Sequence, residues 1–157
     1  MIELVEIMIF ELRGFVEAAY EGDDDLLTDY HVRPMTYEEA VEETLAMISI
    51  TSVGISMRYF GVLMDGDKIG YLVTFENNLY SFSINIDYRC KSVLSEFWEN
   101  IVGVLGDSFV CMLYPNNTRA INWLLRNGMV EVPDMEENCV TLLKVKERVS
   151  ETIFSHN

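Results

Sequence analysis

The sequence has 157 residues, half of them apolar, and a formal net charge of −15 from 26 acidic and 11 basic residues. That length supports one domain with a hydrophobic core and is too short for two ordinary domains. The negative charge repels the backbones of nucleic acids and the surfaces of anionic membranes, so we expect neither as a partner. It can steer a cationic amine or a basic protein toward the chain, and it is at least as typical of a surface that is charged for solubility.

Neither the N-terminus nor the use of cysteine indicates an exported protein. The first residues include acids where a signal peptide carries Lys or Arg, and no apolar run is long enough to cross a bilayer, so we expect a cytoplasmic protein. The three cysteines are an odd number without metal-type spacing, and both histidines lie far from them in sequence. We therefore expect no disulfide framework and no metal site, and we interpret Cys90 as a buried or half-buried thiol without a nucleophilic role.

The first third of the chain alternates strand and helix patterns. Ile2 to Ile7 alternates as a strand does, and Phe10 to Tyr20 has the spacing of a short amphipathic helix. An acidic turn, Asp23 to Asp25, follows, and we interpret it as a solvated helix cap because it lacks the ligand alternation of a calcium loop. Thr36 and Glu39 form a capping box, which predicts a second helix with the inward residues Ala40, Val41, Thr44, Leu45 and Ile48.

The middle of the chain holds three strand patterns and then a helix. Tyr59 to Met64 and Ile69 to Phe75 are β-rich runs separated by an Asp-Gly turn. A third strand alternates from Leu79 through Ile86, after which the period changes. From Ser92 to Leu105 the apolar residues recur at spacings of three and four, which predicts an amphipathic helix. The turn between this strand and helix directs backbone N–H groups at one spot, and such a spot favours an anion.

The last part of the chain continues the alternation of strand and helix. Phe109 to Tyr114 is a continuous apolar run typical of a buried strand. Asn117 is a good N-cap for a helix that Gly128 ends, and two strand patterns follow at Met129 to Val132 and Val140 to Val145. This order of elements predicts a mixed α/β fold with a central sheet.

Two stretches carry motifs of a known family. Ile84 to Leu94 is close to a strand followed by the loop pattern Q/R-x-x-G-x-G/A, and Asn117 to Met129 is close to N-x-x-A-I-x-x-Y-x-K-x-G-F. With the element order, they resemble the GNAT superfamily of acetyl-CoA-dependent N-acetyltransferases. The resemblance implies a GNAT-type α/β fold whose mixed sheet of about six to seven strands is flanked by about four helices. It implies a single domain over residues 1–146, followed by a polar C-terminal tail, residues 147–157.

The resemblance also implies where acetyl-CoA would bind. In this family the backbone of the strand before the loop binds the pantetheine arm, and the amides of the loop hold the pyrophosphate. By position, the strand contacts fall on Ile84 and Ile86, and an asparagine that contacts the thiol arm falls on Asn117. The loop contacts fall on Arg89, Cys90, Lys91, Ser92, Val93 and Leu94. The positive end of the following helix and the two cations of the loop suit a phosphate.

Three positions depart from the family pattern. Ser92 and Leu94 replace the small residues that the loop usually carries, and the Leu94 side chain is expected to obstruct a phosphate that approaches the backbone. Leu124 replaces the tyrosine that often protonates the departing thiolate, and leucine has no proton to give. These changes predict a degenerate acetyl-CoA site. Similar absences give a weaker resemblance to the GNAT-like internal virion proteins of short-tailed phages.

Two functions remain open at this point. The leading prediction is a GNAT-fold protein that is weakly active or inactive and serves as a phage-type virion or partner-binding component, in the host cytoplasm or the virion. The alternative is an active acetyl-CoA-dependent N-acetyltransferase that acts on a cationic amine or a basic protein. For that activity Glu76 and Asp87 are the candidate bases, and Tyr88 is a candidate proton donor beside Tyr80 and Tyr114.

One geometric expectation tests the family resemblance. The strands that end near Ile86 and begin near Phe109 are joined by a helix, and such a connection joins parallel strands. We expect the two strands to be parallel neighbours that separate at their C-terminal ends. The separation would leave a V-shaped cleft beside Ser92.

Overall fold

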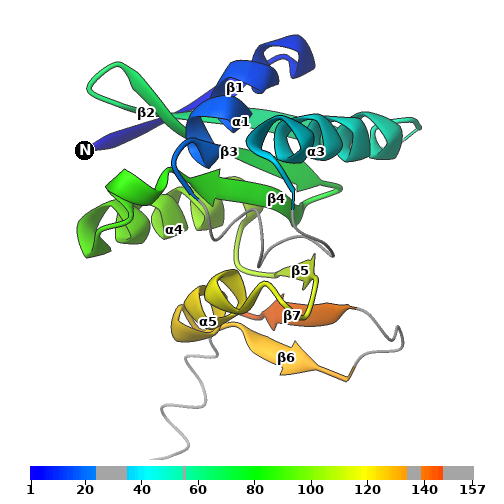
Figure 1. Cartoon of the computed structure of the whole chain (residues 1–157). Helices are drawn as coiled ribbons and strands as arrows, with labels where there is room; N and C mark the ends of the chain where they lie inside the picture. Colours follow the sequence, from blue (N-terminus) through cyan, green and yellow to red (C-terminus); the bar gives the residue numbers. More distant parts are fainter. Residues whose placement is uncertain (24–34, 55, 134–138, 147–157) are drawn as a thin grey trace, which may run out of the picture.

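In the computed structural model, which describes residues 1–23, 35–54, 56–133 and 139–146, the chain forms a seven-stranded sheet in the order β1-β2-β3-β4-β5-β7-β6 (Figure 1). All neighbouring strands are antiparallel except β4 and β5, which are parallel. The strands are β1 (Ile2–Ile7), β2 (Met57–Met64), β3 (Asp67–Phe75), β4 (Asn78–Ile84), β5 (Phe109–Leu113), β6 (Val130–Val132) and β7 (Val140–Lys144). The mixed central sheet expected from the sequence is confirmed.

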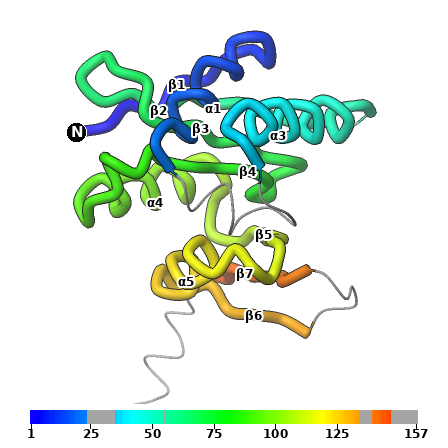
Figure 2. The backbone as a smooth tube through the Cα atoms, in the orientation of Figure 1, coloured from blue at the N-terminus to red at the C-terminus, as the bar shows by residue number. Residues whose placement is uncertain are grey.

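Four α-helices in the described residues cover the two faces of the sheet. Buried side chains of α1 (Leu12–Tyr20) and α3 (Tyr37–Thr51) form one core layer, and those of α4 (Lys91–Leu105) and α5 (Thr118–Arg126) belong to the other. Successive side chains of a strand point to opposite faces, so β3 contributes to both layers. Figure 2 follows the backbone from β4 through α4 to β5 and shows α5, β6 and β7 at the far end of the molecule from α1 and α3.

The strand predicted through Ile86 ends two residues earlier, at Ile84, so this part of the prediction is wrong. The residues that follow form a 3-10 turn, η2 (Ile86–Tyr88). Asn85 causes the change of direction, because its Oδ1 accepts a hydrogen bond from the backbone N–H of Asp87 at 2.9 Å and so mimics a backbone turn. Its Nδ2 donates to the carbonyls of Ala18 and Glu21 at 2.8 and 3.1 Å, which fixes the turn to the end of α1.

The other predicted elements are found with small shifts at their ends. The helix predicted from Phe10 is a 3-10 turn, η1 (Ile9–Glu11), followed by α1. The capping box is confirmed: Thr36 Oγ1 accepts from the N–H of Glu39 at 3.2 Å, and the Glu39 carboxylate accepts from the N–H of Thr36 at 3.1 Å. Across the described ranges, no helix has the length and apolar character needed to cross a membrane. The predicted tail 147–157, two acids of the predicted turn and both histidines lie outside the described residues.

Close packing of α1 on β2 depends on Gly61, and it gives a first prediction. A Cβ atom added to Gly61 would overlap the ring of Phe15. Gly61→Ala is therefore expected to lower the free energy of unfolding by about 1–3 kcal/mol, the usual range for overpacking a core. The control is Gly103→Ala in α4, where an added Cβ meets nothing within 4 Å. Because alanine favours a helix by about 0.5–1 kcal/mol over glycine, this variant should be more stable than the native chain. Chemical denaturation of both variants checks the contrast, which similar changes would refute.

Candidate functional site

A cavity of about 810 Å³ opens where β4 and β5 separate. The two strands share one residue pair, Leu79 with Cys111, and at the closed end the backbone N–H of Val110 donates to Asn78 Oδ1 at 3.0 Å. Toward their C-terminal ends, β4 remains paired with β3, and β5 remains paired with β7. Strands β4 and β5 therefore diverge from each other. The expected parallel pair and the cleft between its strands are confirmed.

A β-bulge in β4 lies at the start of the cleft. Two successive residues of β3 pair with Leu79 and Ser81, so Tyr80 is an extra residue on β4. An extra residue bends its strand and increases the local twist. Beyond the bulge the Ser81 hydroxyl bonds to a tyrosine of the α1 and α3 layer, whereas Phe82 packs in the layer of α4 and α5. The cavity therefore has one wall on each face of the sheet.

The wall on the α4 and α5 side is lined by apolar side chains and by two arginine side chains. Leu94 and Phe97 of α4 and Trp123 of α5 line it, and the Trp123 ring stacks on Phe97 with centroids 6.0 Å apart and an angle of 15° between the planes. Arg119 and Arg126, also from α5, line the same cavity. Sequence analysis missed these arginines, although their spacing of seven places them on one side of a helix together with Trp123. Positive charge therefore gathers here in an otherwise acidic chain.

Asn117 stands at the N-cap of α5, but its side chain makes no capping hydrogen bond. It lines the cavity, and its Oδ1 atom is the one buried side-chain polar atom in the described residues that lacks a hydrogen-bond partner. A buried acceptor without a donor destabilises a protein by about 1–3 kcal/mol. A ligand that donates an N–H group to this oxygen would remove that penalty. The sequence placed Asn117 at the site only through the family resemblance, because an N-cap asparagine normally bonds to its own helix.

The N-terminus of α4 follows η2, with Cys90 as its N-cap residue. The first amides of a helix lack acceptors within it, and the positive end of the helix dipole favours an anion. The pKa of the Cys90 thiol is lowered below its ordinary value in this environment. The causes are a hydrogen bond with Ser92 and hydrogen bonds from backbone N–H groups, including that of Val93. The prediction of a buried or half-buried Cys90 is wrong, since the thiol is exposed.

Of the predicted loop contacts, Arg89 and Leu94 line the cavity, and the four residues between them do not. The cleft is thus bounded by the two ends of the loop and not by Ser92. Among the predicted strand contacts, Ile84 lines the cavity, whereas Ile86 lies in η2 and does not. This difference follows from the early end of β4.

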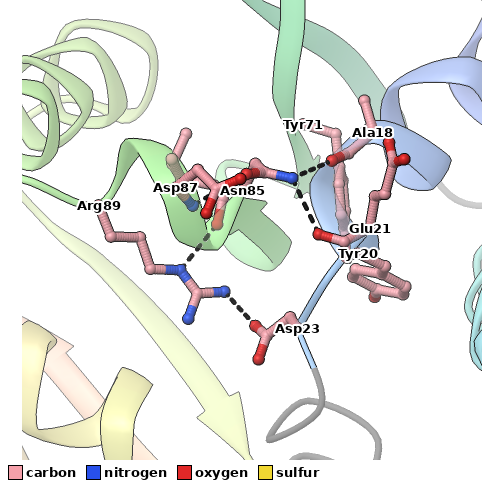
Figure 3. Close-up of polar contacts among 9 residues, drawn as sticks. Ala18, Tyr20, Glu21, Asp23, Tyr71, Asn85, Asp87 and Arg89 are labelled. Carbon is pink, nitrogen blue, oxygen red and sulfur yellow. Dashed lines mark hydrogen bonds and ion pairs between the residues drawn. The ribbon is translucent and has the colours of Figure 1, made fainter.

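Arg89 joins the loop to β4 and to the segment just after α1 (Figure 3). Its Nε donates to the carbonyl of Ile84 at 2.7 Å, and its Nη2 donates to Oδ2 of Asp23 at 2.7 Å. The Asp23 side chain is 0% exposed and that of Arg89 is 16% exposed. The interpretation of Asp23 as part of a solvated turn is therefore wrong, because its carboxylate is the buried partner of a cation. Burial was not visible in the sequence, since 66 residues separate the two groups.

On the α1 and α3 side, four hydroxyl groups form one continuous hydrogen-bonded chain. Thr44 Oγ1 lies 2.8 Å from Tyr20 Oη, which lies 2.8 Å from Tyr71 Oη, which lies 2.8 Å from Ser81 Oγ. All four residues line the cavity. Burial raises the pKa of Tyr20 and raises that of Tyr71 well above the ordinary value, so both phenols stay neutral. Sequence analysis missed this chain because its members come from four elements.

No protein-family model matches the sequence, and no curated protein matches it. Solved structures do match. An acetyltransferase from Thermus thermophilus superimposes with a TM-score of 0.65 at 15% identity, over 92% of this chain and 96% of that one. The PaiA N-acetyltransferase from Thermoplasma acidophilum, in complex with coenzyme A, gives 0.60 at 18% identity, over 92% and 99% of the two chains. A GNAT superfamily phosphinothricin acetyltransferase from Sinorhizobium meliloti, in complex with AcCoA, gives 0.57 at 16% identity, over 95% and 91%.

The chain has the GNAT fold. The similarity extends over nearly the whole of each solved chain, and the mixed sheet with a parallel pair at its centre agrees with it. Within this GNAT fold, Leu124 is 0% exposed and packs in the core beside α4, and it does not line the cavity. The residue that faces the cavity is its neighbour Trp123.

Of the five residues predicted as candidates for catalysis, the tyrosines Tyr80 and Tyr114 line the cavity of this GNAT fold. The other three, Glu76, Asp87 and Tyr88, lie outside its lining. Glu76 is exposed in the turn between β3 and β4, at the closed end of the cleft, with a φ of 44°. Asp87 is exposed in η2, and Tyr88 of the same turn packs against the core layer of α4. Their catalytic roles stay predictions. The carboxylate that does line the cavity is that of Glu43 from α3, which sequence analysis did not single out.

Cys90 gives a second prediction, on where an anion binds to the GNAT fold. Because its pKa is lowered, the thiolate forms at a lower pH than in an ordinary cysteine, and iodoacetamide should label exposed Cys90 before buried Cys111, whose pKa burial raises. If acetyl-CoA binds with its diphosphate at the start of α4, as the family resemblance implies, it should slow the labelling of Cys90. Mass spectrometry measures the label, and Cys90→Ser provides the blank. Labelling of Cys90 at one rate with and without saturating acetyl-CoA would refute this placement of the diphosphate.

Proposed function

We propose that this protein binds acetyl-CoA in the cleft between β4 and β5 and transfers the acetyl group to an amine. The observation that carries the proposal is the buried, unpartnered Oδ1 of Asn117 in the wall of a large cavity. The pantetheine arm has amide N–H groups, which are the donors that this oxygen lacks. The cavity volume of about 810 Å³ also falls within the range of about 300–1,000 Å³ that is usual for ligand sites.

The residues present fit the separate parts of acetyl-CoA. The apolar side chains of Leu94, Phe97 and Trp123 suit the methylenes of the arm. Arg119, Arg126 and the N-terminus of α4 offer positive charge and N–H groups to the phosphates. Acetyl-CoA would supply an activated acyl group as its thioester. The chain would then hold the arm along β4 and present the thioester to the α1 and α3 side.

The acceptor is proposed to be a cationic amine or the amine of a basic protein. Among the described residues that line the cavity, Glu43 is the one acid, and it lies on the side opposite Arg119 and Arg126. A carboxylate at that position would bind an ammonium group and orient it toward the cleft. The net charge of −15 adds long-range attraction for cations.

The proposal is tested by product formation from acetyl-CoA and a panel of polyamines and lysine peptides, measured by mass spectrometry. We expect product above the rate without protein. Glu43→Gln should raise KM for cationic acceptors about tenfold, equivalent to about 1.4 kcal/mol, and leave KM for acetyl-CoA unchanged. The matched control is Glu42→Gln. Glu42 lies next to Glu43 on α3, and its exposed carboxylate pairs with Arg13 of α1. No product with any acceptor, at saturating acetyl-CoA, would overturn the proposed transfer.

A second candidate function is binding without turnover, in the phage-type virion or partner-binding role predicted from the sequence. Leu94 favours it, because a branched side chain stands at the end of the loop where phosphate would approach the backbone. The Arg89 charge is also offset by its ion pair with Asp23. This candidate predicts that acetyl-CoA raises the melting temperature without any product, and that Leu94→Ala strengthens binding. Product from the native chain decides against it.

A further inference from the structure

Acetyl transfer from a thioester to an ammonium group releases protons, and the cavity must give them a path. An ammonium nitrogen loses two protons on its way to an amide, and one of them can leave with the thiol product. The other proton needs a base or a relay. The tyrosine position of the family is the buried Leu124 here, and Glu43 is committed to the acceptor in the proposed function. The hydroxyl chain on the α1 and α3 side is not used in the proposed binding of acetyl-CoA or of the acceptor.

We propose that Ser81, Tyr71, Tyr20 and Thr44 relay the proton that leaves the acceptor nitrogen from the cleft toward α3. The inference rests on the proposed function, since it assigns a proton path to that reaction. Ser81 begins the chain because it belongs to β4 itself, immediately beyond the bulge and beyond the last residue pair of β4 with β5. Its hydroxyl therefore lies at the point where the cleft opens.

The geometry of the chain suits a relay. Its three O···O distances are all 2.8 Å, the usual length for hydrogen bonds between hydroxyl groups. Each hydroxyl donates one hydrogen and accepts another, so the whole chain can reverse its direction by rotation of its hydrogens. Tyr20 and Tyr71 are 5% and 1% exposed, so water does not compete at the middle of the chain. Both ends, Ser81 and Thr44, line the cavity.

The proton leaves the acceptor nitrogen through successive transfers along the four hydroxyl groups. An N–H bond of the acceptor breaks as Ser81 Oγ takes the proton, and the Ser81 hydrogen passes to Tyr71 Oη. The Tyr71 hydrogen passes to Tyr20, the Tyr20 hydrogen passes to Thr44, and Thr44 releases its hydrogen to water. The C–N bond forms while the C–S bond breaks, and the second nitrogen proton ends on the sulfur. No tyrosinate accumulates, in agreement with burial that disfavours the anion. The hydroxyls then rotate back.

Tyr71→Phe interrupts the chain at its centre and tests the relay. With an alkylamine acceptor at neutral pH, we expect kcat to fall about a hundredfold, the lower range for loss of acid–base assistance. Calorimetry should show unchanged binding of acetyl-CoA. An O-alkyl hydroxylamine is already unprotonated at neutral pH, so with this acceptor the fall in kcat caused by Tyr71→Phe should be much smaller. With the alkylamine, the difference in kcat between the native chain and Tyr71→Phe should decrease as the pH rises. A role in packing alone would reduce turnover of both acceptors by the same factor at every pH.

The matched control is Tyr37→Phe, which removes a hydroxyl that donates to the Glu17 carbonyl at 3.0 Å in the same core layer but outside the cavity. This variant should keep the native kcat. In the protein without ligand, NMR should detect slowly exchanging Oη–H signals of Tyr20 and Tyr71, and Ser81→Ala should shift the signal of Tyr71 and not that of Tyr37.

The outcomes separate the two proposals. If the native chain makes no product, the proposed function fails and the relay fails with it. If the native chain is active and Tyr71→Phe has the native kcat, or loses the same factor with both acceptors, the relay alone is overturned. Absence of both hydroxyl signals in the protein without ligand would likewise overturn the relay while leaving the transfer in place.

Discussion

Replacing Asp23 with alanine is expected to lower the free energy of unfolding by about 3–5 kcal/mol, because it removes the buried carboxylate that pairs with the largely buried Arg89 guanidinium. The ion pair joins the chain just after α1 to the loop before α4, and Asn85 connects the same segments through two further hydrogen bonds. Loss of the pair should therefore loosen one edge of the cavity as well as the fold. Denaturant unfolding of the native chain and the variant measures the difference.

Two controls distinguish a buried charge from a generally sensitive segment. Asp87→Ala removes an exposed carboxylate in η2, two residues before Arg89, and should change the free energy of unfolding by less than about 0.5 kcal/mol. The double variant Asp23→Leu with Arg89→Met removes both charges and should recover most of the loss, since apolar replacement of a buried ion pair is often neutral. A single variant as stable as the native chain, or a double variant no better than the single one, would contradict this account of the pair.

Leu124→Tyr is expected to lower the free energy of unfolding by about 1–3 kcal/mol, because it forces a phenol into a core position that is 0% exposed. The control is Leu125→Tyr, since Leu125 is 38% exposed on the same helix and should accept the ring with little change. Thermal unfolding compares the two variants. The substitution restores the tyrosine of the family pattern in sequence, but Leu124 does not line the cavity, so turnover should not rise. Turnover by Leu124→Tyr above that of the native chain would contradict this account, because it would mean that the side chain at position 124 contacts the reacting groups.

Local patterns were sufficient for most of the fold. The capping box at Thr36 and the β-rich run of β3 depend on neighbours within a few residues, and both appear as predicted. The parallel placement of β4 and β5 followed from the helix between them, because few connections allow another arrangement. The end of β4 was misplaced, since Asn85 turns the chain with bonds to α1 that no local pattern encodes.

The site was less predictable because its chemistry comes from distant contacts. The motif at Asn117 falls on a residue that lines the cavity, but only the structure shows that its oxygen lacks a partner. Asp23 was misjudged because its partner is 66 residues away. The hydroxyl chain through Tyr20 and Tyr71 joins elements that are far apart in sequence, and each tyrosine alone has the pattern of ordinary packing. The predicted acids Glu76 and Asp87 were chosen for nearness in sequence, and neither lines the cavity.

We propose that Asn117 Oδ1 accepts a hydrogen bond from acetyl-CoA in the cleft, and calorimetric titration of acetyl-CoA tests this claim most directly. The native chain should bind, and Asn117→Ala should bind about tenfold more weakly, equivalent to about 1.4 kcal/mol. Without ligand this variant should unfold at the native temperature or above it, because the change removes a buried acceptor that has no partner. Asn122→Ala, at an exposed position of the same helix, should match the native chain in binding. No binding by the native chain, or equal affinity of the native chain and Asn117→Ala, would contradict the claim.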